Sequence, residues 1–502
     1  MNIPFKQDPE EYRQGMLFPG NLFDLLPKDH SCFVYEDIFQ QIDAASLMKN
    51  YSLNGQHAFD PRLLTSILIY AYTQGIFSSR QIRQKCQEDL GFKYIAHMQM
   101  PDFRVISDFR KDHHEFFKAC FKQSVLLAVE AGLASLGHVS LDGSKFKADT
   151  SKHKAMSYKR LKEQEKQLTD EIESLIRRAE QCDAEEDKEY KERTGYEIPD
   201  DLKFKETRLK KIKAAKEALE KREKELYPDK PIDEKKQISF ADHDARIMGK
   251  NGRFDYDYNA QISVDEDNQI IVGQHVSQNA TDQKEVSPAI DEIQKNTGQL
   301  PEKMSTDNGF FSGDNLENLN AAGIDAYVAC GKEQPDARSI DECERKIKKS
   351  DFTYDEENDC FICPQGQSLP LKTSGKDGIK VYQASMDVCS RCSYQDRCCH
   401  SIKGEARTIR TDAKEPFRKA MLEKMRQPSS RETYRKRKHI VEPVFGQIKG
   451  NRRFRGFHVR GSPKVGGEFS LVCMAHNFSK IVNAVFRGAA CLQSGKLAPA
   501  IA

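Results

Sequence analysis

The sequence has no apolar run that approaches the roughly 20 residues needed for a membrane-spanning helix. Its first residues, MNIPFKQDPEEYRQG, lack the basic and then apolar pattern of a secretory signal peptide. These two absences argue against a membrane protein and against a secreted protein. We therefore expect a soluble, cytoplasmic protein with no membrane partner.

A strong net charge is also missing. The 502 residues carry a net charge of +2, with 31% charged and 38% hydrophobic residues. This balance permits folding, and the average hides a segregation of charge along the sequence. A chain of this length exceeds what one hydrophobic core usually organises, so we expect several domains or insertions.

Cysteine is sparse over most of the chain, and the majority of the 14 cysteines lie late in the sequence. Such a diluted set argues against a disulfide scaffold and favours reduced thiols. The spacing Cys389-x2-Cys392 is typical of structural zinc sites. Cys363 with either Cys398 or Cys399 would complete four thiolate ligands for a structural Zn²⁺. The alternative is a group of reduced, partly buried thiols.

Helical periodicity dominates from Asp60 to about Leu133. The stretch DPRLLTSILIYAYTQG predicts a helix that ends at Gly75, and one long helix is predicted after Pro101. The basic residues of this region include Arg80, Arg83, Lys85, Arg104 and Arg110. The pattern is compatible with a helix-turn-helix-like DNA-binding bundle, and also with a plain helical bundle that has solvated arginines.

The pattern changes abruptly after Gly137, where His138–Leu141 predicts a buried strand. This strand would deliver Asp142 at its end, and Gly143 would permit a turn directly after it. The Lys- and Glu-rich stretch 152–233 has two apolar seams at helical spacing, which predicts an inserted antiparallel helical hairpin. Its charge is interpreted as a solvated face, or alternatively as a basic arm that touches DNA or a partner subunit.

Further strands are expected downstream. The runs Tyr258–Val264 and Gln269–Val276 flank the acidic turn DEDN and predict a β-hairpin. Asp307 follows a short strand-like segment, and DAYVAC at 325–330 predicts another strand. Strands and helices in this order indicate a mixed α/β sheet rather than a doubly wound parallel one.

The segment Arg431–Arg460 carries ten Lys or Arg residues against Glu432 and Glu442 only. A block of this composition is expected to bind phosphates. The candidates for DNA contacts are Arg437, Lys438, Lys449, Arg452, Arg453 and Arg455. The isolated Glu442 is either a solvated salt-bridge partner or a metal ligand beside bound phosphate.

Three carboxylates suit metal-dependent chemistry on a phosphodiester. Asp142 and Asp307 at strand ends, and Glu442 on a later helix, would converge on two Mg²⁺ (or Mn²⁺) ions, since such cations prefer carboxylate oxygens. Among 77 acidic residues a triple of this kind carries little weight by itself. The local setting of each acid adds to it.

Six motifs together carry a family resemblance: PDFRVISDFR, VSLDGSKFKA, FADHDARIM, YNAQISVD, STDNGFF and IVEPVFGQIK. With them the chain resembles the DDE transposases of bacterial insertion sequences, in the subgroup with a ribonuclease H-like catalytic domain. The resemblance implies that Asp142, Asp307 and Glu442 are the catalytic acids. It also implies DNA as partner, both transposon terminal repeats and target DNA, a homodimer or higher oligomer on that DNA, and a nucleoid-associated location.

The family's final signature consists of Tyr, Arg, Glu and Lys at fixed spacings. This chain keeps the Glu and the Lys in register but has Arg435 where Tyr is expected and Lys438 where Arg is expected. Tyr434 and Arg437 each stand one position early. The role of Tyr434 is therefore open, whereas the assignment of Glu442 is unaffected.

The expected fold is α/β, with a ribonuclease H-like mixed sheet. The expected parts are a helical N-terminal DNA-binding or dimerisation domain (1–135), a catalytic domain (136–335 and 428–487) with the inserted hairpin (152–233), a Cys-rich insertion (336–427) and a disordered tail (488–502). The expected activity is hydrolysis at transposon ends followed by strand transfer. The alternatives are a nuclease of the same fold without strand transfer, and a DNA-binding regulator or scaffold whose acids no longer bind metal.

Overall fold

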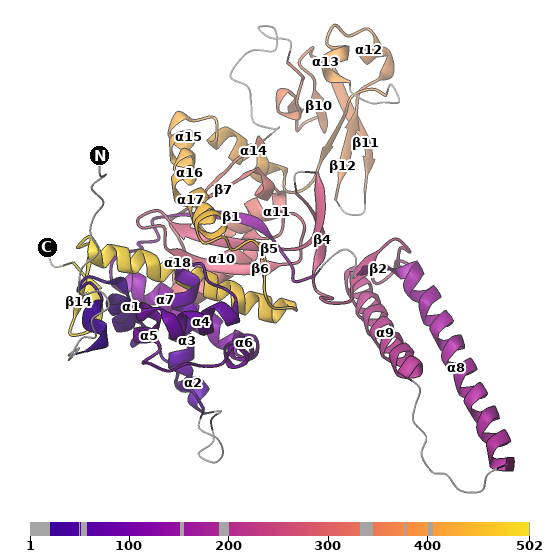
Figure 1. Cartoon of the computed structure of the whole chain (residues 1–502). Helices are drawn as coiled ribbons and strands as arrows, with labels where there is room; N and C mark the ends of the chain where they lie inside the picture. Colours follow the sequence, from indigo (N-terminus) through magenta and orange to yellow (C-terminus); the bar gives the residue numbers. More distant parts are fainter. Residues whose placement is uncertain are drawn as a thin grey trace, which may run out of the picture.

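A central mixed sheet organises the protein (Figure 1). The computed structural model describes residues 21–49, 51, 58–150, 155–189, 200–250, 252–331, 345–375, 378–399 and 405–500. The strands of the sheet are β1 (His138–Lys147), β4 (Arg246–Lys250), β5 (Arg253–Asp265), β6 (Ile271–Ser277), β7 (Lys303–Thr306) and β8 (Asp325–Val328). Their order is β4-β5-β1-β7-β8, and β6 shares the outer edge of β5 with β4.

Strand directions in this sheet are mixed, as the sequence predicts. β5 runs antiparallel to both β1 and β6, whereas β7 runs parallel to β1 and β8 runs parallel to β7. The predicted β-hairpin is present as β5 and β6. Helices α10 (Val286–Thr297) and α11 (Gly313–Ala321) connect β6 to β7 and β7 to β8.

β1 is longer than predicted, and this corrects the position of Asp142. The strand continues past Leu141 to Lys147, because β5 supplies partners in continuous register from Val139 to Lys147. Asp142 therefore lies in the middle of the strand, opposite Ile262, and there is no turn after it.

The N-terminal region is helical, as predicted. Its helices are η1 (Leu22–Leu25), α1 (Ser31–Phe39), α2 (Ala45–Met48), α3 (Pro61–Thr73), α4 (Ser79–Glu88), α5 (Leu90–Ile95), α6 (Phe103–Asp112) and α7 (His114–Glu130). The Asp60 carboxylate caps α3 by accepting a hydrogen bond from the backbone N–H of Arg62 (2.8 Å). The prediction of one long helix after Pro101 was wrong, because His113 leaves helical geometry and separates α6 from α7.

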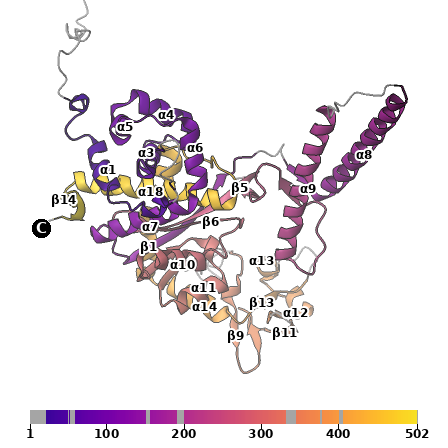
Figure 2. The same cartoon turned by 90° about the horizontal axis from the view of Figure 1, so that it is seen from below.

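Helix α18 (Ser462–Phe486) lies between the sheet and the N-terminal helices (Figures 1 and 2). The side-chain amide of Asn477 donates to the backbone carbonyl of Ile271 (2.9 Å) and accepts from its N–H (2.8 Å), which covers the edge of β6. α18 is long and apolar enough to cross a membrane by composition alone. Most of it is buried, and it serves as a core helix.

One hydrophobic core includes both the N-terminal helices and the sheet. Tyr72 of α3 donates a hydrogen bond to the fully buried Glu468 of α18 (2.7 Å), and Arg110 of α6 lies 3.7 Å from the same carboxylate. Arg110 is thus an internal residue rather than a DNA contact. At the end of α3, a Cβ on Gly75 would lie 2.9 Å from the carbonyl oxygen of Arg452, so the helical region packs directly on the basic segment.

Two insertions extend away from the sheet (Figure 1). The predicted helical hairpin consists of α8 (Tyr158–Glu189) and α9 (Asp200–Leu226), and the short strand pair β2 (Ala155–Ser157) and β3 (Gln237–Ser239) lies at its base. Its apolar seam includes the buried Leu161, Leu168, Ile212 and Leu219.

The Cys-rich insertion has a small antiparallel sheet and a core of its own. Its elements are η5 (Lys349–Asp351), β9 (Thr353–Asp355), β10 (Cys360–Ile362), β11 (Ser368–Ser374), β12 (Lys380–Gln383), α12 (Met386–Ser390), α13 (Gln395–Cys398) and β13 (Thr408–Thr411). Helix α14 (Glu415–Lys424) leads from it back to the main body.

The C-terminal tail was predicted to be disordered, and its described part is instead ordered. Its described part forms a hairpin of β14 (Ala490–Gln493) and β15 (Lys496–Pro499). The backbone N–H of Leu497 donates to the side chain of Gln41 (3.1 Å), and Ala490 is buried in the main core. These long-range contacts order a segment whose composition alone indicates disorder.

Candidate active site

Asp142 lies in a protected position on β1. Its Oδ1 accepts a hydrogen bond from the backbone N–H of Gly143 (3.0 Å), and its side chain is 18% exposed. Burial raises the pKa of Asp142 to about 6, the charge of Arg437 opposes this rise, and the charge of Asp307 adds to it.

Asp307 is brought beside Asp142 by the parallel pairing of β7 with β1. Thr306, the last residue of β7, is in register with Leu141 of β1, so the residues that follow them, Asp307 and Asp142, lie next to each other. Asp307 caps η3 (Asn308–Phe310), and its Oδ1 accepts from the backbone N–H of Gly309 (2.8 Å). The sheet therefore places two acids together that are far apart in the sequence.

Glu442 joins this pair through Arg437. Nη2 of Arg437 lies 2.9 Å from Oδ1 of Asp142, and Nη1 lies 3.4 Å from Oε1 of Glu442. Arg437 is only 7% exposed, whereas the Glu442 side chain is 50% exposed. The guanidinium is a buried bridge between two carboxylates, which differs from the predicted role of Arg437 as a DNA contact.

The helical segment that carries these residues is interrupted twice. It consists of α15 (Pro428–Arg435), α16 (Arg437–Ile440) and α17 (Glu442–Gly446). Burial raises the pKa of Tyr434, and the charges of Arg437, Asp307, Asp142 and Glu442 all act on its hydroxyl. Tyr434 and Arg437 thus face the acids, whereas Lys438 is exposed.

A π-helical turn, η6 (Gln447–Asn451), follows α17 and contains Lys449. The Lys449 ammonium donates to the backbone carbonyl of Lys145 (2.7 Å) and lies 4.0 Å from the ring centre of Phe146. Lys449 is thereby anchored against β1. Such π turns change which face of a helix a side chain occupies, and they are frequent at functional sites.

Only some of the predicted DNA-contacting residues in the basic segment Arg431–Arg460 face solvent. Arg453 and Arg455 are exposed. Arg452 instead turns inward and donates to Ser479 Oγ of α18 (3.0 Å), and burial lowers its pKa. Arg452 is therefore a packing residue in this structure rather than a phosphate contact.

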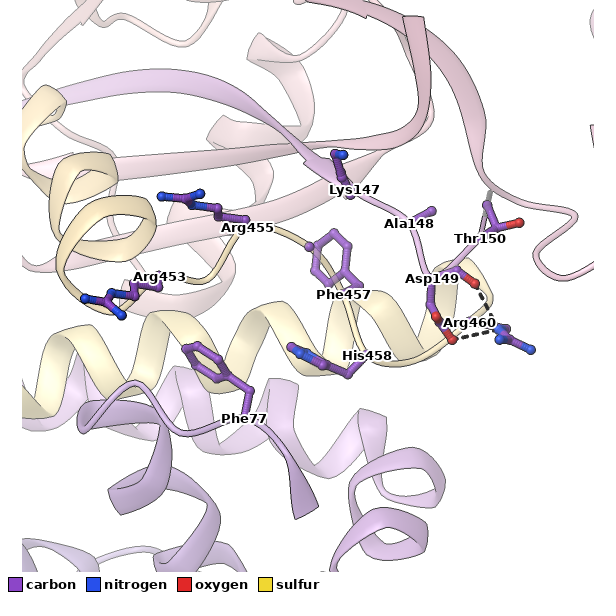
Figure 3. Close-up of a pocket in the computed structure, with 11 residues that line it drawn as sticks. Phe77, Lys147, Ala148, Asp149, Thr150, Arg453, Arg455, Phe457, His458 and Arg460 are labelled. Atoms are coloured by element: carbon purple, nitrogen blue, oxygen red, sulfur yellow. Dashed lines mark hydrogen bonds and ion pairs between the residues drawn. The ribbon is translucent and has the colours of Figure 1, made fainter. Parts of the chain in front are cut away.

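The exposed arginines line a cavity of about 520 Å³ (Figure 3). Its walls include Lys147 at the end of β1, and the N–H of Phe457 donates to the carbonyl of Lys147 (2.8 Å), which fixes the basic segment to the sheet. The ring of His458 stacks on Phe77 of the N-terminal region at 5.7 Å. The cavity is a cationic groove between three parts of the chain.

Two family models match the chain. The model described as Transposase domain (DUF772) matches residues 20–112, and the model described as Transposase DDE domain matches residues 362–482. The chain belongs to the DDE transposases. No curated relative matches it. In this transposase the second match includes Arg437 and Glu442, whereas Asp142 and Asp307 lie between the two matches.

Five cysteines of the transposase line one cavity of about 550 Å³. They are Cys363, Cys389, Cys392, Cys398 and Cys399. All five are free thiols, and burial raises the pKa of Cys398 to about 12. Among the described residues no group of three or more His, Cys, Asp or Glu side chains is arranged to hold a metal ion, so the zinc prediction is unsupported and the thiols stand as a reduced, partly buried group.

The same absence holds for Asp142, Asp307 and Glu442, which among the described residues do not form a group arranged to hold a metal ion. Arg437 instead joins Asp142 to Glu442. Sequence reasoning missed this bridge. A signal was present, since Tyr434 and Arg437 are three residues apart and fall on one helical face. If the segment is treated as one regular helix, Lys438 instead of Arg437 falls on the same face as Glu442. The segment is interrupted at Lys436 and Val441, so helical spacing across these residues does not apply.

Proposed function

We propose that this DDE transposase belongs to an insertion sequence, and that it hydrolyses DNA at the ends of the element and joins the freed ends to target DNA. The proposal rests most on one observation: Arg437 pairs with Asp142 and Glu442, and the pairing of β1 with β7 places Asp307 beside Asp142. Acids from three distant parts of a chain repel one another, so their gathering suits a site that binds further positive charge.

The strand order and directions support a ribonuclease H-like catalytic domain. The first acid lies on the central strand β1 and the second follows the parallel neighbour β7. The third begins α17, which packs next to α16, and α16 contacts β1. Helices connect β6 to β7 and β7 to β8. This arrangement supports the fold that the sequence motifs imply.

The residues present fit a pair of divalent cations. The acids offer hard oxygen ligands, and Asp142 is held with a raised pKa beside a single compensating cation, Arg437. Asp142, Asp307 and Glu442 would hold Mg²⁺ or Mn²⁺. When bound, such ions would neutralise phosphate charge, lower the pKa of an attacking hydroxyl and stabilise the leaving oxygen.

The proposed reaction consists of two steps, hydrolysis and strand transfer. In the first, a water oxygen attacks phosphorus at the end of the element, the bond to the 3′ oxygen breaks, and that oxygen leaves as a 3′-hydroxyl. In the second, this hydroxyl attacks a target phosphodiester, forms a new bond to phosphorus and releases a target 3′-hydroxyl. Both steps displace an alcohol at phosphorus, so one site can serve both.

The protein's own residues would position the DNA. Arg453, Arg455 and Lys147 in the cationic groove would contact backbone phosphates, which fixes the register of the duplex without reading its sequence. Lys449 is anchored beside β1 and would place its charge close to the acids. Tyr434 would offer a hydroxyl at the same point.

The test uses purified full-length protein, Mg²⁺, and DNA that carries the two sequences flanking its own gene. We expect nicked or excised ends and, with added target plasmid, joined products on a denaturing gel. Cleavage without joined products would indicate a nuclease. Binding without cleavage, unchanged by Asp142→Asn, would indicate a DNA-binding regulator and would overturn the proposal.

A further inference from the structure

Asp282 lies in the loop between β6 and α10 and reaches back to the sheet. Its Oδ1 accepts hydrogen bonds from the side-chain amides of Asn259 (2.8 Å) and Gln261 (2.6 Å), two neighbours on one face of β5. These two donors fix one carboxylate oxygen. No hydrogen bond to the other oxygen, Oδ2, occurs among the described residues.

Two glycines show how close this carboxylate is to the two aspartates of the active site. A Cβ on Gly143, directly after Asp142, would lie 2.7 Å from Oδ1 of Asp282. A Cβ on Gly309 would lie 3.2 Å from Oδ2 of Asp282 and 3.0 Å from Oδ1 of Asp307. Asp282 thus packs closely against both glycines, and its Oδ2 faces the side of the site where Asp307 stands.

Gln261 supplies an independent sign of a missing ligand. Its side chain is completely buried, and its Oε1 has no hydrogen-bond partner among the described residues, although its Nε2 is bound to Asp282. The same amide lies against Gly143, since Nε2 and Oε1 would be 2.3 and 2.7 Å from a Cβ there. A buried, unsatisfied oxygen is unfavourable unless water or a hydrated cation completes it.

The charges around Asp282 also favour a missing cation. Asp282 is one of the groups whose negative charge raises the pKa of Asp142. Arg437 contacts Asp142 and Glu442 on the other flank and has no contact with Asp282. Among the described residues, no ion pair compensates the negative charge of Asp282 on its flank of the site.

We propose that Asp282 is a fourth metal-binding carboxylate, which shares a divalent cation with Asp307 and is held in position by Asn259 and Gln261. This inference rests on the proposed function, because it places Asp282 in the same metal site. The ligand class is a hard divalent cation, Mg²⁺ or Mn²⁺, since the donors are all oxygen atoms. If Asp282 served only to anchor the β6–α10 loop, its Oδ2 would not need to face Asp307 without a hydrogen-bond partner.

The decisive measurement is Mn²⁺ affinity of the full chain by isothermal titration calorimetry without DNA. Asp282→Asn keeps an oxygen for the two amide donors and removes only the charge, and we expect it to weaken Mn²⁺ binding about 10-fold or more. Asp282→Glu should retain affinity better than Asp282→Asn. The matched control is Asp267→Asn, which makes the same change on the exposed β5–β6 turn and should leave the affinity unchanged.

The outcomes separate this inference from the proposed function. If Asp142→Asn and Asp307→Asn abolish Mn²⁺ binding while Asp282→Asn does not change it, Asp282 is a loop anchor and this inference is wrong. If none of the three variants changes binding, the metal site itself is wrong. Should Asp282→Asn unfold, Fe²⁺-directed oxidative cleavage of the wild-type backbone decides, since its absence around residue 282, with cuts beside Asp307, would overturn the assignment.

Discussion

Nη2 of Arg437 lies 2.9 Å from Oδ1 of Asp142. The residues come from a late helix and the first strand of the main sheet, and the same guanidinium lies 3.4 Å from Glu442. The buried guanidinium thus supplies positive charge to two of the carboxylates that the proposed metal site would use as ligands. Metal binding and the Arg437 contacts are expected to be coupled.

Replacement of Arg437 by Met should destabilise the metal-free protein, because it leaves Asp142 without its cation. We expect a loss of up to about 3 kcal/mol in the free energy of unfolding. Added Mn²⁺ should restore more stability to Arg437→Met than to the wild type, since the ion takes over the missing charge. Thermal unfolding with and without Mn²⁺ measures both effects, and equal Mn²⁺ shifts for the two proteins would contradict the coupling.

Removal of any one of the three acids should abolish chemistry but not DNA binding. Asp142→Asn, Asp307→Asn and Glu442→Gln are each expected to lower the cleavage rate by about 10³-fold or more, since several kcal/mol of transition-state stabilisation depends on the bound cations. Asp267→Asn is the control of equal charge change. Gel assays of cleavage and of binding in the absence of metal distinguish this result from general unfolding. A variant that cleaves at the wild-type rate would remove that acid from the site.

Metal binding should depend on pH through Asp142. The ordinary pKa of an aspartate is 3.8 and that of folded Asp142 is about 6, so the folded state binds the additional proton between these values. Stability from this group is therefore present at low pH and lost as the pH rises through about 6. Mn²⁺ needs the ionised form, so its affinity should rise through the same window. Calorimetric titrations from acidic to neutral pH test this, and a flat profile would argue against it.

Arginines of the basic segment should separate into two classes. Arg453→Gln and Arg455→Gln should weaken binding to specific and unrelated DNA alike, and each lost contact should flatten the slope of log affinity against log salt by about 0.9. Arg452→Gln should instead lower stability, because its guanidinium bonds to α18. Salt titrations and denaturant unfolding of the three variants provide the comparison. An unchanged salt slope for Arg453→Gln and Arg455→Gln would exclude the groove as the DNA path.

Local patterns in the sequence were sufficient for much of the fold. Helical spacing located α3 and the α8–α9 hairpin, and alternation around DEDN located β5 and β6. The order of these elements indicated the mixed sheet. These features are readable because side-chain periodicity reports which face of an element is buried. Asp142, Asp307 and Glu442 were selected through the family motifs that contain them, and their joint role in metal binding stays a prediction.

Other features depend on partners that are distant in the sequence. β5 extends β1 beyond Asp142, Gln41 orders the tail that was expected to be disordered, and Ser479 draws Arg452 inward. The choice of Arg437 over Lys438 follows from breaks in a helix that local spacing treats as regular.

The sequence by itself therefore determined the elements, the mixed sheet and the family motifs of this transposase. The tertiary structure alone decided which charges are buried and which acids meet. Asp282 shows the distinction, because nothing in its own loop marks it, and only the packing of that loop against Gly143 and Gly309 brings it to Asp307. The physical reason is that electrostatic environment depends on distance in space and on burial, and neither can be read from the order of residues.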